Sequence, residues 1–330
     1  MQRQVHNWMM TLTIPMEYGL LQRKSLGQAF HQIFGYLHTL KVPSPHFGVT
    51  AFIIALVTAL LLSGCKSLVS KATGGMANNL SRAMLNQDDP ETVRDGVPAY
   101  LLMLDSFVLG SPDDVAMLSA TAELYAAYGV IFVDDPDRAE RLTEKSLVYA
   151  QRALCLSNEV GCGLVDLHLQ EVRPRLESMA VEDVGALYTF GLSWLGFIQA
   201  RAGQAAALAQ LPQATMIMER TRELDPHYRA HQVELYLAVL NTIRPPALGG
   251  DFRAGREHYE KALELSGGRD LNVKVKYARY YARTLYDRDL HDRLLIDVLE
   301  ADPVQVDLTL ANTLAQREAR VLLGSADEHF

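Results

Sequence analysis

Few residues of this sequence have types and a spacing that could perform chemistry. His227, His231 and Glu234 are spaced i, i+4 and i+7, so on a helix they would share one face and could bind a metal ion. No HExxH pattern accompanies them, and no further strong ligand lies close in sequence. Surface or helix-capping roles therefore explain these residues better, and we expect no bound metal.

A glycine-containing run around Ser193 is a second candidate, for nucleophilic catalysis. The run from Gly191 to Gly196 has the spacing G-x-S-x-x-G, one residue longer than a nucleophile elbow. Trp194 in this run fits better as the aromatic position of a helical repeat. Gly267 and Gly268 end a predicted helix instead of opening one after a strand, so they form no phosphate-binding loop. We therefore expect neither an enzyme nor a cofactor.

Cys65 is the residue with the strongest chemical signal. It follows an apolar run of 14 residues, and Leu62-Ser63-Gly64-Cys65 looks like a bacterial lipobox. A membrane span needs about 20 apolar residues, whereas a run of this length suits the core of a secretory signal. In a lipobox the cysteine is acylated and becomes the new amino terminus, so we expect a lipid bilayer as a partner. The alternative is a buried apolar segment followed by an ordinary cysteine.

Residues 1–64 are accordingly interpreted as a leader and lipoprotein signal peptide, and residues 65–79 as a lipidated linker. The part before the apolar run is longer than the basic leader of a signal peptide. One explanation is that translation starts at Leu40, in which case residues 1–39 would not be part of the native protein. Lys66, in place of an aspartate, favours the outer membrane over the inner membrane, with the body of the protein facing the periplasm.

Cys155 and Cys162 are the other two cysteines of the chain. They flank a short loop that follows a predicted helix. Because the periplasm is oxidising, a disulfide between them is one interpretation. The other interpretation is that both are small buried hydrophobic residues.

The elements that must position these residues are helices. Ala, Leu, Glu and Arg dominate and strand-type alternation is almost absent, which predicts an all-α fold. Helix breakers at Pro226, Gly267 and Pro303 are 41 and 36 residues apart, close to the tetratricopeptide period of about 34 residues. Before each breaker, small and large residues alternate on one helix face; these stripes are Ala214/Met218/Thr221, Gly255/Tyr259/Ala262 and His291/Leu295/Val298.

We therefore predict that residues 80–330 form a tetratricopeptide-like array of helix-turn-helix pairs. Four degenerate pairs precede a closing helix from Leu308 to Leu323, which would cap the array. The net charge of the chain is −8. An acidic surface repels phosphate backbones, so nucleic acid is not an expected partner.

A cluster of tyrosines and arginines is the best candidate for a ligand or partner groove. The tyrosines are Tyr277, Tyr280 and Tyr281, of which Tyr277 and Tyr281 share a helix face, and Arg279 and Arg283 form a basic stripe. The inner helices of such arrays line a concave surface, which is where we expect these residues. Core packing is the alternative for tyrosines at helical spacing. Weaker candidates for the same groove are Tyr236, Trp194 and Arg244.

Several longer stretches resemble one known family. They are Gly96–Asp105, Asp134–Ala139, Arg244–Gly250, Glu264–Arg269, Leu290–Leu295 and Asn312–Arg320. From about residue 60 to the C-terminus, the chain is similar to the TatT component family, the lipoprotein T subunit of tripartite ATP-independent periplasmic (TRAP) transporters. Residues 1–48 have no counterpart in it.

This resemblance implies more than the residue patterns show. It implies a helical periplasmic body with cryptic tetratricopeptide motifs, and association with the substrate-binding P subunit of a TRAP transporter. It also implies a trimer with a channel or groove through each protomer, through which an organic ligand could be relayed. The alternative function is a general tetratricopeptide scaffold lipoprotein for envelope or outer-membrane assembly.

Overall fold

The computed structural model describes residues 79–330, and within this range the chain contains helices, turns and loops but no strand. The expected all-α fold is confirmed. The interpretations of residues 1–64 as a leader, of Cys65 as a lipidation site and of the following linker lie outside the described residues, apart from Asn79. A short helix at residues 79–85 precedes the main array.

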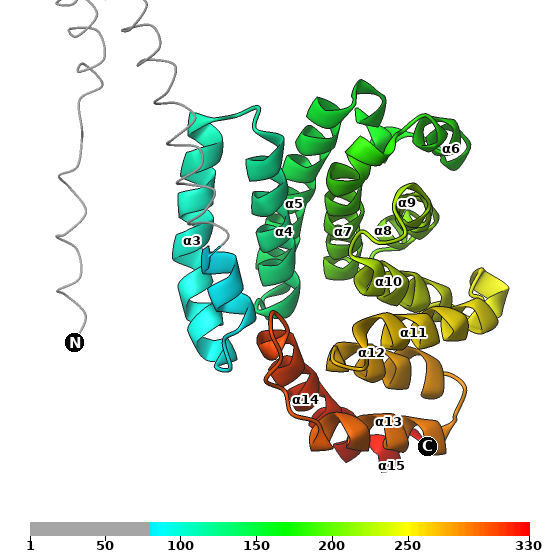
Figure 1. The fold of residues 1–330 in the computed structure, drawn as a ribbon. Coiled ribbons are helices and arrows are strands. Elements are labelled where there is room, and N and C mark those ends of the chain that lie inside the picture. The colour runs from blue at the N-terminus through cyan, green and yellow to red at the C-terminus, as the bar shows by residue number, and fades with distance from the viewer. Residues whose placement is uncertain (1–78) are drawn as a thin grey trace, which may run out of the picture. The chain divides into compact units, whose positions relative to one another are not determined.

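The main helices follow one another with short connections (Figure 1). They are α3 (Pro90–Gly110), α4 (Val115–Ile131), α5 (Pro136–Ser157), α6 (Leu169–Glu177), α7 (Val184–Ala200), α8 (Ala205–Leu208), α9 (Leu211–Leu224), α10 (Ala230–Thr242), α11 (Phe252–Ser266), α12 (Leu271–Lys276), α13 (Arg288–Glu300), α14 (Thr309–Gly324) and α15 (Ala326–His329). Single 3-10 turns are η1 (Glu159–Gly161), η2 (Leu164–Asp166), η3 (Val181–Asp183) and η4 (Pro246–Leu248), and η5 (Tyr277–Ala282) is a stretch of π-helix.

Aspartate residues define where many of these helices begin. Asp89, Asp135, Asp251 and Asp287 each accept a hydrogen bond from a backbone N–H in the first turn of α3, α5, α11 and α13. Such a cap satisfies a donor that has no partner within the helix. The local sequence therefore determines these helix starts.

One predicted helix start is shifted. Ser111 followed by proline predicts the start of a helix, but α4 begins at Val115 and its cap is Asp114, whose Oδ1 accepts from the Met117 N–H at 3.0 Å. The Ser111 carbonyl instead accepts from the Asp114 N–H at 3.3 Å, which makes the serine part of the preceding turn. The Asp114 carboxylate caps this helix in place of the Ser111 hydroxyl.

The helices pack as successive antiparallel pairs. These pairs are α4 with α5, α7 with α9, α10 with α11, and α12–η5 with α13, after which α14 packs on both α12 and α13. These contacts are compatible with the predicted helix pairs, and α14 covers the range predicted for the closing helix. The nine residues of the three predicted stripes are all buried. At Gly255, a Cβ atom would lie 2.4 Å from Thr242 Cγ2, so only glycine lets α10 and α11 approach this closely.

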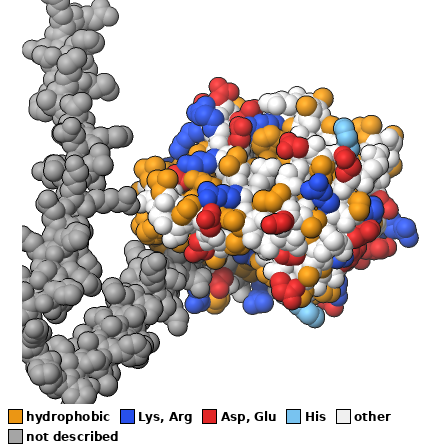
Figure 2. All heavy atoms as spheres, turned by 90° about the horizontal axis from the view of Figure 1, so that it is seen from above, with side chains coloured by type: hydrophobic (Ala, Val, Ile, Leu, Met, Phe, Trp, Pro, Cys, Tyr) orange, Lys and Arg blue, Asp and Glu red, His pale blue; other side chains and the backbone are white. Residues whose placement is uncertain are grey.

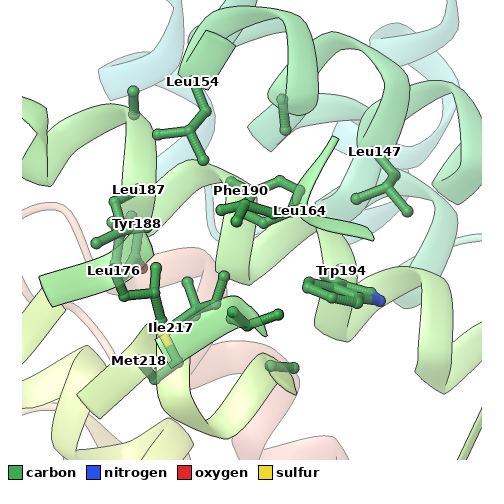
Figure 3. Close-up of a cluster of buried hydrophobic side chains, with 14 of the residues drawn as sticks. Leu147, Leu154, Leu164, Leu176, Leu187, Tyr188, Phe190, Trp194, Ile217 and Met218 are labelled. Atoms are coloured by element: carbon green, nitrogen blue, oxygen red, sulfur yellow. The ribbon is translucent and has the colours of Figure 1, made fainter. Parts of the chain in front are cut away.

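The largest hydrophobic cluster lies between α5, α7 and α9. Leu154, Phe190, Trp194, Ile217 and Met218 belong to it, and all five are fully buried (Figure 3). Burying a large apolar side chain contributes on the order of 2 kcal/mol. This cluster therefore holds the middle of the array together.

The two ends of the array lie side by side (Figure 1). The helix α14 contacts α3, and Leu310 at its start packs against the cluster that includes Val93 and Val97 of α3. Arg317 on α14 forms two hydrogen bonds to Glu91 on α3, at 2.5 and 2.9 Å. The inner helices are thus arranged around a common centre.

A candidate ligand cavity inside the helical array

A cavity of about 490 Å³ lies on the inner side of the array. A volume of this size is in the range of small-molecule sites, which run from roughly 300 to 1,000 Å³. The inner helix of each pair contributes to its wall, together with α14. The wall residues are Ala126, Ala127, Val130, Ile131, Leu192, Leu195, Gly196, Ile198, Gln199, Ala202, Leu208, Leu211, Leu235, Tyr236, Val239, Leu240, Ile243, Asn272, Lys276, Tyr280, Ala311, Leu314, Ala315 and Glu318.

Most of this wall is aliphatic because each inner helix is apolar on two faces. On α7, Leu192, Leu195 and Gln199 point into the cavity at helical spacing. On another face of the same helix, Phe190 and Trp194 are buried in the core between α5, α7 and α9. The second apolar face, on which Leu192 and Leu195 also pack against that core, lines the cavity.

The polar part of the wall comes from α12, η5 and α14. Lys276 Nζ lies 3.0 and 3.2 Å from the two carboxylate oxygens of Glu318, and Arg279 Nε lies 2.9 Å from Glu318 Oε1. Asn272 and Tyr280 flank Lys276 on the same face, four residues before and after it. The lysine and the glutamate are the two charged residues of the cavity wall.

Tyr236 of α10 lies on the cavity wall between aliphatic residues. Its burial raises the pKa of the phenol to about 12. The hydroxyl therefore stays protonated at neutral pH and can donate a hydrogen bond. Of the residues predicted to form a groove, Tyr236 and Tyr280 lie on the wall of this cavity.

The predicted tyrosine pair of the groove lies instead in the protein core. The ring of Tyr277 stacks on Tyr259 at 4.6 Å between centroids, and Tyr281 packs beside Tyr277 and Phe252. The next stripe of the same helix, which carries Tyr280, faces the cavity. In this stack Tyr277 is 4% exposed, and such aromatic pairs are stabilising beyond the area that they bury.

Arg279 and Arg283, two of the three predicted arginines, make side-chain contacts within the protein. Arg279 binds Glu318 and so lies next to the cavity wall, whereas Arg283 donates to the Leu322 carbonyl at 3.0 Å and to Ser325 Oγ at 2.7 Å. Arg244 lies in the turn after α10, where its backbone carbonyl approaches Gly250.

Trp194 lies away from the cavity. Its ring is fully buried, and its Nε1 donates to Gln210 Oε1 at 2.7 Å. This is the packing role expected of an aromatic repeat position. Tyr280 belongs to the predicted tyrosine and arginine cluster and does line the cavity, whereas Lys276 and Glu318 were not among the predicted groove residues.

His227, His231 and Glu234 do not share one helix face as predicted, because His227 lies in the turn before α10. Glu234 Oε2 lies 2.5 Å from His258 Nδ1, while His231 Nε2 lies 3.5 Å from Asp270 Oδ2. Burial lowers the pKa of His231 and raises the pKa of Asp270, so burial disfavours the charged form of both groups. Within residues 79–330 no three His, Cys, Asp or Glu side chains are grouped so as to hold a metal ion.

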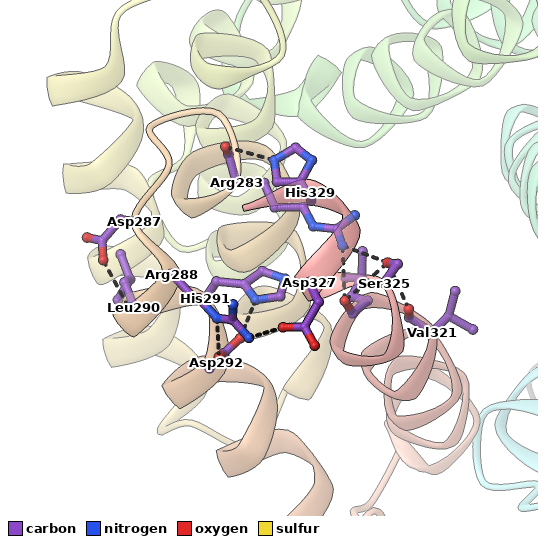
Figure 4. A network of polar contacts seen from close by, with 11 residues as sticks. Arg283, Asp287, Arg288, Leu290, His291, Asp292, Val321, Ser325, Asp327 and His329 are labelled. Carbon is purple, nitrogen blue, oxygen red and sulfur yellow. Dashed lines mark hydrogen bonds and ion pairs between the residues drawn. The ribbon is translucent and has the colours of Figure 1, made fainter.

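The C-terminal end of the array is held by a polar network (Figure 4). Arg288 contacts Asp292 at 3.4 Å and Asp327 at 2.5 Å, and His291 lies 2.8 Å from Asp292 through its Nδ1. Burial lowers the pKa of His291. These contacts attach α15 to α13 and η5, which closes the last pair.

The outer surface carries charges of both signs. Figure 2 shows Lys and Arg side chains interspersed with Asp and Glu over the face in view, with hydrophobic side chains between them. In the part of the chain that the structure describes, no helix combines the length and the apolar character needed to cross a bilayer.

The described residues form a helical array with an apolar cavity on its inner side. The comparisons with known proteins assign this array to a family. The TRAP transporter T-component family matches residues 86–330, and the chain belongs to this family. The expected resemblance to the T component is thereby confirmed.

A relative from Treponema pallidum (strain Nichols) is similar to this chain over most of its length. It is 24% identical over 324 residues, which cover 86% of this chain and 99% of the relative, and it bears the description "Uncharacterized protein". Membership of the family makes this protein an accessory of TRAP transport, associated with TRAP transporter components at the membranes of the cell envelope.

Proposed function

We propose that this protein is a lipid-anchored, periplasm-facing accessory of a TRAP transporter that binds the substrate-binding P subunit and holds an organic ligand in its cavity. The observation that carries the proposal is the apolar cavity of about 490 Å³, built by inner helices that lie within the family match. Small-molecule sites are typically lined by apolar side chains with a few polar groups, as this cavity is.

In this proposal the lipid anchor is attached to Cys65, which is acylated after the signal peptide is cleaved behind Gly64. Two or three acyl chains would hold the protein stably at the membrane, which a single chain cannot do. Cells expressing the protein should incorporate radiolabelled palmitate into it, and Cys65→Ser should abolish the label. Separation of inner and outer membranes by density then shows on which membrane it resides, with the outer membrane expected.

Binding to the P subunit is tested with the full chain and the P subunit from the same organism. We expect association at micromolar concentration in a pull-down and by isothermal titration. A P subunit from an unrelated TRAP system is the matched control and should not bind. If the cognate pair shows no association at this concentration, the proposed function is wrong.

The same preparation tests the proposed homotrimer. Light scattering coupled to size exclusion gives the mass of the assembly with and without the P subunit. We expect three copies of the chain, each with its own cavity. A monomer at micromolar concentration would remove the trimer from the proposal without affecting the binding of the P subunit.

A further inference from the structure

We propose that the outer face formed by α3 and α5 lies on the bilayer surface and binds anionic phospholipids there. We call this surface the membrane face. Its exposed apolar residues are Leu102, Leu109, Val148 and Leu156, and its basic residues are Arg141, Lys145 and Arg152. The inference rests on the proposed function in one respect, that a lipid anchor at Cys65 brings the array to a membrane. It adds which side of the array faces that membrane and which headgroups this side contacts.

The first observation is the exposed apolar side chains on the first long helix of the array. Leu102 and Leu109 of α3 are 71% and 83% exposed, and Val148 and Leu156 of α5 are 56% and 43% exposed. The terminal units of a helical-repeat array normally present a polar outer face, which keeps the array soluble. Apolar side chains gathered on such a face mark a contact with another protein or with a membrane.

The two helices present these side chains on one continuous surface. Leu102 and Leu109 lie about one turn before and one turn after Asp105, on the same side of α3. This side faces α5, because Asp105 pairs with Lys145 of that helix at 2.6 Å. At the edge of Figure 2 where α3 lies, hydrophobic side chains gather and Lys and Arg side chains lie beside them. The apolar residues of α3 therefore adjoin the outer side of α5.

Basic side chains form a stripe along this outer side of α5. Arg141, Lys145 and Arg152 are spaced i, i+4 and i+11, and Val148 at i+7 lies between them, so all four share one helix face. Arg152 contacts Asp113 at 3.0 Å, and within residues 79–330 Arg141 takes part in no ion pair. Apolar side chains next to Lys and Arg are the combination that binds a protein surface to anionic headgroups.

The charge of the rest of the chain makes this stripe an orienting feature. The net charge is −8, so an anionic bilayer repels the acidic parts of the surface and attracts the part that carries the stripe. A two-fold contact between copies of the chain would instead bring two basic stripes together, and like-charge repulsion disfavours it. An anionic lipid surface is the occupant that satisfies both the apolar and the basic side chains.

The tether to the proposed anchor allows this contact. Cys65 precedes Asn79, the first residue of the described array, by 79 − 65 = 14 residues. At about 3.4 Å for each extended residue, this tether spans at most about 50 Å. Lys66 and Lys71 are the charged residues between the two positions, so the tether itself is attracted to an anionic surface. An anchored array stays close to the bilayer, and a weak contact is then enough to hold one face on it.

The test measures how close the membrane face comes to lipid acyl chains. The full acylated protein carries a bimane label at Leu109→Cys, attached without reductant, and is reconstituted into vesicles of phosphatidylethanolamine and phosphatidylglycerol with brominated acyl chains. We expect the bromine atoms to lower the fluorescence by at least about twofold, because an interfacial apolar face lies at the boundary of headgroups and acyl chains. The control label at Leu248→Cys, a residue 67% exposed in η4, should lose little fluorescence.

The charge of the stripe is tested with Arg141→Gln combined with Arg152→Gln. This variant should lower the ratio of engaged to disengaged molecules by roughly tenfold, as should replacing phosphatidylglycerol by phosphatidylcholine. The matched control is Arg253→Gln combined with Arg256→Gln on α11, which removes one arginine without an ion pair and one exposed arginine paired with Glu260. It should behave like the unmodified protein. Circular dichroism checks that each variant keeps its helical fold.

Equal quenching at positions 109 and 248, or quenching that neither the arginine variant nor the neutral lipid changes, would overturn the inference. Loss of the quenching when the P subunit is added would assign the face to that protein instead. Failure of the inference is distinguishable from failure of the proposed function. Palmitate incorporation without quenching at position 109 rejects the membrane face alone. Quenching at position 109 in a chain that takes up no palmitate rejects the anchor and supports the membrane face.

Discussion

At the scale of single residues, Cys155 and Cys162 show how a covalent bond can stabilise one turn of the fold. Cys155 lies near the C-terminus of α5, Cys162 follows η1, and the structure joins them in a disulfide with 4.4 Å between their Cα atoms. Arg175 of α6 donates to the Cys162 carbonyl at 3.0 Å. The bond therefore holds the loop from which α6 is positioned.

We predict that the native protein contains this disulfide. Reduction should raise the intact mass by the mass of two hydrogen atoms. The variant Cys155→Ala is the control and should show no such change. Closing a loop of this size restricts the unfolded chain, so removing the bond should lower the free energy of unfolding by about 2 kcal/mol. Urea denaturation with and without reductant measures the difference. An unchanged mass on reduction would show two free thiols.

At the scale of helices, one carboxylate connects the first three helices of the array. Asp105 of α3 accepts hydrogen bonds from Tyr125 of α4 and from Lys145 and Tyr149 of α5, at 2.8, 2.6 and 2.8 Å. Burial acts to raise the pKa of Asp105, but these three donors outweigh it, so the pKa lies below its usual value of 3.8. The ionised form is thus the one that the fold stabilises.

Asp105→Asn should therefore be less stable at neutral pH. Hydrogen bonds to a charged group contribute about 1 to 3 kcal/mol, and we expect a loss within that range in urea denaturation at pH 7. A carboxyl with a lowered folded-state pKa contributes stability above its unfolded pKa and loses it as the pH falls through the folded pKa. The difference between the two proteins should shrink below about pH 4.

Asp113→Asn is the matched control, because its contact with Arg152 is an exposed ion pair. Such pairs contribute at most about 1 kcal/mol, so this variant should stay close to the unmodified protein. A loss at Asp105 that persisted unchanged at pH 3 would contradict the explanation by ionisation and point to packing.

The π-helical stretch η5 is the other feature of this scale. The Arg283 N–H donates to the Ala278 carbonyl at 3.0 Å, a wider turn than that of an α-helix. In this segment Tyr277 faces α11 while Tyr280 faces the cavity. The wider turn occurs where one helix packs against the core and lines the chamber at the same time.

At the scale of the whole described array, the contact between α3 and α14 decides whether the inner helices surround the cavity. Polar side chains form the edge of this contact, and we call them the seam. Glu91 binds Arg317, and Asp307 accepts from Arg82 at 3.3 Å and from Asn86 at 2.8 Å. The hydrogen bond from Arg317 lowers the pKa of Glu91 to about 2, so the pair remains ionised at ordinary pH.

Reversing one charge of this seam should loosen it. In Glu91→Lys we expect faster hydrogen exchange of the backbone amides in the first half of α14, because like charges then face each other. Exchange in α9 should stay unchanged, since Ile217 and Met218 of this helix pack in the core with α7, away from the seam. The double variant Glu91→Lys with Arg317→Glu restores the attraction and should restore protection. Equal exchange in the single variant would show that apolar packing around Leu310 holds the seam alone.

Local chemistry along the sequence determined the helices, most of their aspartate caps and the buried stripes such as Gly255, Tyr259 and Ala262, because these depend on neighbours within a few turns. The stretches typical of the T-component family, from Gly96 onward, can likewise be recognised from the sequence alone. What faces the cavity was decided by tertiary structure. A helical period indicates which residues share a face, but not which of two apolar faces meets the core.

The choice between the stripes of Tyr277 and Tyr280 depended on the ring of Tyr259 in another helix. The pair of Lys276 and Glu318 likewise joins residues 42 positions apart, and the seam at Glu91 joins the two ends of the array. Such contacts depend on the crossing angles between all successive helices, which together set the curvature of the array. No single segment of the sequence determines these angles.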